Sequence, residues 1–111
     1  MKTSQRKGRG GEIELSTILN EHGIPATPGN PLNFGKVPDV VGVEGIHVEV
    51  KRVEKLNVGE AMNQAIRDSE KFRDGMPALF HRRNRQPWLV TMRLDDWLKL
   101  YKGVKDEHFA E

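Results

Sequence analysis

Two acids and a lysine in the first half of the chain have the types and the spacing that chemistry could use. Asp39 follows Pro38, and Glu49 and Lys51 stand two positions apart ten residues later. Residues two apart on a strand project from the same face, so the carboxylate and the ammonium group would point the same way. Carboxylate oxygens bind Mg²⁺, and a lysine beside the ion would stabilise charge developing on a phosphate. The set indicates metal-assisted hydrolysis of a phosphodiester.

Whether Asp39 shares that face depends on the hairpin between the two strands. A two-residue turn at 44–45 would pair Asp39 with Val50 and send its carboxylate to the opposite face. A three-residue loop ending at Gly45 pairs Asp39 with Glu49 instead, and it puts the glycine where a left-handed backbone is common. A bulge just before the aspartate would have the same effect. The site therefore requires one of these two arrangements.

The acid-x-lysine triplet is a weak signal alone, because 16 acids in 111 residues make about one such triplet expected by chance. The alternative is that His47, Glu49 and Lys51 form the solvated side of a half-buried strand. A third acid on the first helix would favour a site. Glu12 lies at the border of that helix's apolar stripe, whereas Glu14 points further toward solvent. An acid in a first helical turn also complements the helix dipole, which is the alternative for Glu12.

The order of elements predicts an α/β domain. Apolar residues at helical spacing predict three helices, over 10–22, 58–73 and 94–102. Apolar runs and alternation predict four strands, over 37–43, 45–53, 78–82 and 88–92. The segment 26–36 is rich in proline, glycine and asparagine and is predicted to be a loop. The order α-β-β-α-β-β-α indicates a mixed central sheet flanked by helices, with Trp97 in the core.

The composition excludes several classes of protein. The length fits one domain over 1–111, and the absence of cysteine excludes disulfide scaffolds and thiolate metal sites. There is no apolar run of membrane-spanning length, and no apolar segment follows the basic N-terminus as in a secretory signal. We therefore expect a cytoplasmic protein with no membrane partner. Four histidines without a paired spacing argue against a histidine-based metal site.

The net charge is only +2, but the basic residues gather in two stretches. The first nine residues contain no acid, and we expect them to form a flexible arm carrying Lys2, Arg6, Lys7 and Arg9. The second stretch surrounds a predicted hairpin turn and carries Arg82, Arg83 and Arg85. Two such clusters on a nearly neutral chain favour a nucleic acid partner, here DNA. The alternative is that both stretches are simply solvated surface.

Taken together, the motifs resemble a known group of nucleases. The series Pro38-Asp39, Glu49 and Lys51 resembles the signature of the PD-(D/E)xK nuclease superfamily. More narrowly, KGRGGEIELSTILNEHG at 7–23 and LNVGEAMNQAIRDSEKF at 56–72 are similar to helices of archaeal-type Holliday junction resolvases. The resemblance covers most of residues 6–93. The segment from residue 80 onward is more similar to compact nucleases encoded by phages.

The resemblance implies a restriction-endonuclease-like fold and an Mg²⁺-dependent endonuclease, with Mn²⁺ as a substitute, that cuts branched DNA such as a four-way junction. Asp39 and Glu49 would be the main metal ligands, joined by the carbonyl of Val50. Glu12 would be the helix acid that helps to bind the metal, and Lys51 would be the catalytic lysine.

The resemblance also implies a homodimer, DNA contacts for the basic N-terminal segment, and a place near the scissile phosphate for Gln64. Because the end of the chain departs from the resolvase pattern, two alternatives remain open. Relatives that cut flaps or plain duplex share the same four catalytic residues, so a flap- or duplex-cutting nuclease is one. A non-catalytic DNA-binding module on the same fold is the other.

Overall fold

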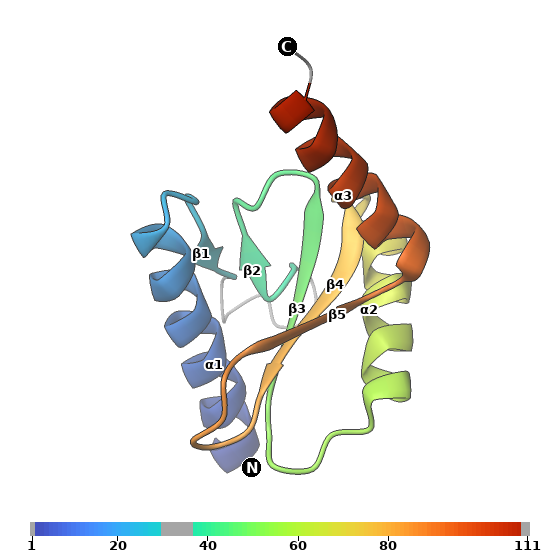
Figure 1. Ribbon diagram of the computed structural model, residues 1–111. Coiled ribbons are helices and arrows are strands. Elements are labelled where there is room, and N and C mark those ends of the chain that lie inside the picture. The colour runs from blue at the N-terminus through green and yellow to red at the C-terminus, as the bar shows by residue number, and fades with distance from the viewer. Residues whose placement is uncertain (1, 30–36, 110–111) are drawn as a thin grey trace.

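The computed structural model describes residues 2–29 and 37–109, which form three helices and a five-stranded mixed sheet (Figure 1). The elements are α1 (Lys2–Glu21), β1 (Thr27–Pro28), β2 (Val40–Val41), β3 (Ile46–Arg52), α2 (Val58–Phe72), β4 (Met76–Arg82), β5 (Leu89–Met92) and α3 (Leu94–Phe109). The sheet order is β1-β2-β3-β4-β5, with β3 and β4 parallel and the other pairs antiparallel. The predicted α/β class with a mixed sheet is confirmed. Within these residues, no helix has the length and apolarity to cross a membrane.

The predicted order of elements lacks one strand. Thr27 and Pro28 were expected in a loop, but they pair with Val41 and Val40 as a short edge strand. Proline is tolerated there because an edge strand leaves one side without a ladder of hydrogen bonds. The rest of the predicted loop, 30–36, lies outside the described residues.

Helix α1 begins at Lys2 and not at Gly10, so the residues expected to form a flexible arm are its first turns. The three glycines near this point weaken a helix by about 1 kcal/mol each, which made the N-terminal extension hard to predict. One of them is needed for packing. A Cβ at Gly11 would lie 2.9 Å from the Cβ of Arg52, so glycine lets α1 approach β3 closely.

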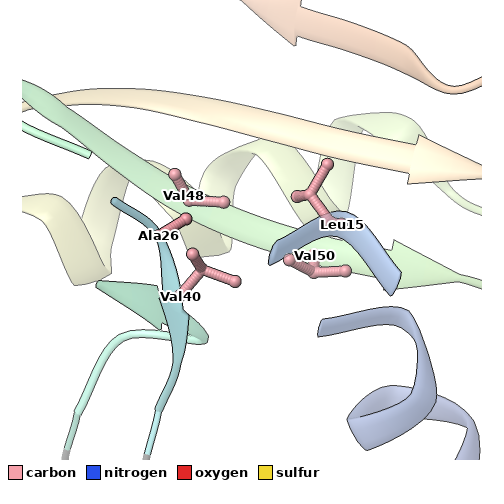
Figure 2. Packing of buried hydrophobic residues seen from close by; sticks show 5 residues of the cluster. All are labelled: Leu15, Ala26, Val40, Val48 and Val50. Carbon is pink, nitrogen blue, oxygen red and sulfur yellow. The ribbon is translucent and has the colours of Figure 1, made fainter. Parts of the chain in front are cut away.

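Strand β3 is buried on both faces, which differs from the half-solvated strand considered as an alternative. On one face, Val48 and Val50 join a core cluster that Leu15 of α1 completes together with Ala26 and Val40 (Figure 2). Its other face packs against α2, and there His47 is 1% and Glu49 3% exposed. These polar side chains therefore need partners inside the protein.

The hairpin between β2 and β3 adopts the three-residue register. Val40 pairs with Val48, which puts Asp39 opposite Glu49 on the neighbouring strand. Gly45 has a φ of 81°, in the left-handed region expected for the last loop residue. The arrangement that the predicted site requires is therefore present.

Helix α3 runs to Phe109, well beyond the predicted end at residue 102. The expectation that Trp97 lies in the core is wrong, because its side chain is 48% exposed and stacks on the ring of Tyr101, with centroids 5.3 Å apart. Helical spacing predicts which residues share a face, but it does not say whether anything covers that face. In Figure 1, α3 projects from the body of the molecule at the end opposite the N-terminus.

The start of the parallel pair β3–β4 depends on Gly75, which has a φ of 133°. A Cβ at this position would lie 2.3 Å from the carbonyl of Gly45. We predict that Gly75→Ala destabilises the protein by about 3 kcal/mol or more, through backbone strain and this clash. Gly23→Ala is the matched control, since Gly23 also has a positive φ but open space around it; it should cost about 1 kcal/mol. Urea unfolding measures both, and equal losses would contradict the packing role.

Candidate active site

Three carboxylates from separate parts of the chain meet beside β3. Glu12 comes from α1, Asp39 immediately precedes β2, and Glu49 lies in the middle of β3. The Asp39 Oδ2 accepts a hydrogen bond of 2.9 Å from the backbone N–H of Val50. Because β2 begins one residue later, this side chain bonds the edge of β3 where a backbone ladder would otherwise continue. Tertiary folding thus brings together acids that are far apart in the sequence, with 37 positions between Glu12 and Glu49.

The Asp39 carboxyl has a pKa raised to about 7. Burial is the largest cause, and the negative charges of Glu49 and Glu12 raise the pKa further. The hydrogen bond from Val50 opposes these effects without cancelling them. A carboxyl that holds its proton near neutral pH marks a place where negative charge is in excess and a cation would be stabilised.

Glu12 is partly buried, and burial raises its pKa, against the lowering effect of Arg9. The Arg9 Nη1 lies 3.4 Å from the Glu12 Oε1 and also donates a hydrogen bond to the carbonyl of Gly29. The border position predicted for Glu12 therefore does bring its carboxylate to Asp39 and Glu49. Arg9, predicted to lie in a flexible arm, belongs to helix α1 and pairs with Glu12 at the border of the carboxylate cluster, and its predicted DNA contact stays a prediction.

Lys51 lies between Glu49 of the carboxylate cluster and the solvent. Its Nζ lies 3.9 Å from the Glu49 Oε2, and its side chain is 31% exposed. The lysine also lines a hollow of about 490 Å³ between β3 and α2, to which Gln64 and Arg67 contribute. Gln64, predicted to lie near the scissile phosphate, is thus on the wall of the space that Lys51 faces. The hollow is an open space beside Lys51 that could admit a ligand.

Val50 contributes its backbone to the same edge. The N–H and C=O groups of one strand residue point to the same side, so the Val50 carbonyl points toward the side on which Asp39 binds its N–H. This position agrees with the metal-ligand role implied for the carbonyl, although that role itself stays a prediction.

His47 is a feature that the spacing of residues did not reveal. Its Nδ1 lies 2.9 Å from both carboxylate oxygens of Asp74, and its ring stacks on Phe72. On the other side, its Nε2 lies 3.6 Å from the Glu49 Oε1. Burial lowers the pKa of His47, but the two carboxylates outweigh burial and raise it overall. The expected solvated histidine is wrong, because α2 and the segment after it cover this face of β3.

Glu14 and Arg82 are also placed differently from the predictions. The Glu14 carboxylate, expected in solvent, accepts hydrogen bonds from Arg82, from the Arg52 Nε at 3.1 Å and from the Trp88 Nε1 at 3.1 Å. Burial would raise its pKa, but the bonds from Trp88 and Arg52 and the charge of Arg82 lower it overall. Arg82, predicted to bind DNA, therefore ties β4 to α1.

Arg83 and Arg85 remain exposed in the turn between β4 and β5. This turn lies beside the N-terminal half of α1, so the two basic stretches of the sequence occupy the same end of the molecule (Figure 1). The side chains of Lys2, Arg6 and Lys7 lie outside the described residues, and their predicted DNA contacts stay predictions.

Comparison of this chain with protein families, curated proteins and solved structures finds no match. The geometry of the carboxylates, Lys51 and the neighbouring hollow therefore carries the functional inference.

The raised pKa of Asp39 predicts how stability depends on pH without metal. The unfolded chain releases this proton near 3.8 and the folded protein near 7. Stability is therefore lost as pH rises through this window. In EDTA, raising pH from 5 to 8 should lower the melting temperature of the wild type more than that of Asp39→Asn. We expect a difference of about 4 °C or more, since one pKa unit is about 1.4 kcal/mol.

Glu44→Gln is the control for this experiment, because it also removes a carboxylate, at an exposed position in the β2–β3 turn. Its melting temperature should follow that of the wild type at both pH values. Parallel curves for the wild type and Asp39→Asn would show that Asp39 titrates normally.

Proposed function

We propose that this protein is a Mg²⁺-dependent endodeoxyribonuclease of the PD-(D/E)xK type, with a restriction-endonuclease-like fold, that cuts branched DNA as Holliday junction resolvases do. One observation carries the proposal: Glu12, Asp39 and Glu49 converge from three separate elements, and burial together with the charges of Glu49 and Glu12 raises the pKa of Asp39 to about 7. Lys51 stands at the edge of this cluster, toward open space. A buried or partly buried group of acids has no evident structural purpose that apolar residues would not serve better.

The donors in the cluster suit a hard divalent cation. Mg²⁺ takes oxygen ligands, and Asp39 and Glu49 provide carboxylates while Val50 provides a carbonyl on the same side. Glu12 would join directly or through water. When bound, the ion would polarise a phosphoryl oxygen and lower the pKa of an attacking water. Mn²⁺ has similar ligand preferences and is expected to replace Mg²⁺.

Lys51 would act on the substrate itself. Its ammonium group would orient the attacking water and stabilise the negative charge that develops on the phosphate during attack. The hollow beside it provides room for the DNA backbone, with Gln64 and Arg67 as hydrogen-bond donors to phosphate oxygens. The acids would thus hold the cation from one side, and Gln64 and Arg67 of α2 would bind the DNA strand from the other.

The basic end of the molecule supports DNA as the partner. Arg83 and Arg85 are exposed next to the N-terminal turns of α1, which carry Lys2, Arg6 and Lys7. Neutralisation of phosphates by such groups supplies most of the sequence-independent affinity for DNA. Arg83 and Arg85 would therefore bind the phosphates of the duplex arms that flank the cleavage site.

We further propose that the protein acts as a homodimer, joined by the apolar surface of β5 and α3. Leu89 and Val90 of the edge strand are more than half exposed, and the exposed apolar surface continues along α3 through Leu94, Trp97, Leu100, Tyr101 and Val104. Exposed edge strands and contiguous apolar patches are usually covered. A second copy would cover them by two-fold symmetry and would present two sites to a four-way junction.

The nuclease proposal is tested on four-way, flap, splayed and linear DNA of matched sequence, with Mg²⁺, Mn²⁺ or EDTA. We expect metal-dependent cleavage with a preference for the four-way junction. Asp39→Asn and Lys51→Ala should each reduce cleavage by about 100-fold or more while binding is retained. The control is Glu44→Gln, which leaves the exposed hairpin turn without a charge and should cleave normally.

The outcomes also separate the alternatives. Preferred cleavage of flaps or linear duplex would indicate the flap- or duplex-cutting nuclease. Junction binding without cleavage in either metal would indicate the non-catalytic DNA-binding module. Full activity of Asp39→Asn would contradict the assigned site.

The dimer is tested by sedimentation of the wild type and of Trp97→Glu. A buried charge at this position should weaken association at least about 10-fold, because the interface would bury an unpaired carboxylate. Lys99→Glu changes a neighbouring exposed residue of α3 and should leave association unchanged. A wild type that sediments as a monomer at high micromolar concentration would contradict the proposal.

A further inference from the structure

Two buried side chains of β3 and a partly buried one of α2 form a second group of potential metal ligands. His47, Glu49 and Asp68 each offer one ligand atom, and these atoms lie within 4.8 Å of one another. The group lies on the α2 side of Glu49, whereas Asp39 approaches it from the β2 side. The set contains an imidazole, which the carboxylate cluster of the nuclease site lacks.

The Nε2 of His47 is the atom that points to a ligand. It is buried and has no hydrogen-bond partner among the described residues. Leaving a buried polar atom without a partner costs about 1–3 kcal/mol. Its nearest acid, the Glu49 Oε1, is 3.6 Å away, which is too long for a hydrogen bond.

The partner of the other ring nitrogen sets the chemistry of Nε2. Asp74 accepts from Nδ1 with both carboxylate oxygens at 2.9 Å, so Nδ1 carries a proton. Nε2 then faces the negative Glu49, as an N–H in the imidazolium that the two carboxylates favour or as a lone pair in the neutral ring. Either a proton or a metal ion between the two groups would offset the charge of Glu49.

The distance favours a metal ion over a proton. A charge-assisted hydrogen bond would bring Nε2 and the carboxylate oxygen to about 2.7–2.9 Å. Two ligands of one tetrahedral Zn²⁺ are about 3.4 Å apart, given bonds of about 2.0–2.2 Å. The observed 3.6 Å is close to the second value. Asp74 also supplies what zinc-bound histidines usually have, a carboxylate that orients the ring from the opposite nitrogen.

We propose that His47, Glu49 and Asp68 form a binding site for a borderline divalent metal such as Zn²⁺, with Asp74 positioning the histidine. Imidazole with carboxylates suits zinc and neighbouring transition metals, whereas Mg²⁺ prefers oxygen ligands alone. The site is distinct from the proposed Mg²⁺ site but shares Glu49, which presents Oε1 to His47 and Oε2 to Lys51. Metal at one site therefore changes the charge available to the other.

The test uses the full-length protein stripped with EDTA, with Co²⁺ as a spectroscopic substitute for Zn²⁺. We expect visible absorption from a nitrogen-containing, low-coordinate Co²⁺ site, displaced by Zn²⁺ in calorimetric titration. His47→Gln and Asp68→Asn should each weaken binding at least about 10-fold. Asp68 is only partly buried and lies on a helix, so Asp68→Asn preserves a test if His47→Gln fails to fold. Circular dichroism checks folding.

Two further variants make the assignment specific. Glu70→Gln removes an exposed acid from the same helix and should bind Co²⁺ as the wild type does. Asp39→Asn should also retain the Co²⁺ spectrum, although the proposed nuclease would lose its activity, so failure of one proposal is distinguishable from failure of the other. Absence of a Co²⁺ spectrum, its survival in Asp68→Asn, or its loss in Asp39→Asn would each overturn the second site.

Discussion

Strand β3 is covered by helices on both faces, and its polar residues are therefore buried together with their charges. Glu49 has Asp39 on one side, His47 on the other and Lys51 at its outer end. A buried carboxylate is costly without compensation, and here another carboxylate is its neighbour. Several unusual features of the site follow from the need to compensate the buried charge of Glu49. They include the raised pKa of Asp39 and the hydrogen bond that Asp39 accepts from Val50.

The open edge of β3 determines where the carboxylates of the site gather. Because β2 is only two residues long, the edge of β3 beyond it is left to side chains, and Asp39 binds the backbone there. The same edge lies under α1, which adds Glu12. On the far side of β3, helix α2 brings the hollow next to Lys51. A short strand and two covering helices thus place the acids on the inside of the site and Lys51 on its accessible side.

Outside the site, some polar residues hold the elements together and others remain exposed for binding. Glu14 binds Arg52, Arg82 and Trp88, so it fastens α1 to the ends of β3 and β4 and to the turn that follows. This leaves Arg83 and Arg85 exposed at the end where α1 begins. At the opposite end, α3 carries apolar residues that the rest of the described chain does not cover. The proposed DNA surface therefore lies at the opposite end from the α3 part of the proposed dimer surface, whereas Leu89 of β5 lines the same hollow as Arg83.

The sequence by itself determined the local features and the candidate acids. Periodicity predicted the helices, most strand positions and the α/β class, and Gly45 was compatible with the hairpin register that aligns Asp39 with Glu49 but left the two-residue turn open. Local patterns failed wherever the outcome depended on covering surfaces. The alternation in β3 is equally consistent with a wet face, and only α2 decides that His47 and Glu49 are buried. The same limit applies to Trp97, which has the spacing of a core residue but no element packed over it.

Asp74 and Glu14 acquired their partners through contacts 27 or more residues apart, which spacing rules within one element cannot reach. Residue types and spacing decide which groups can do chemistry, but the three-dimensional packing decides which of them share charge, since electrostatic coupling depends on distance and burial.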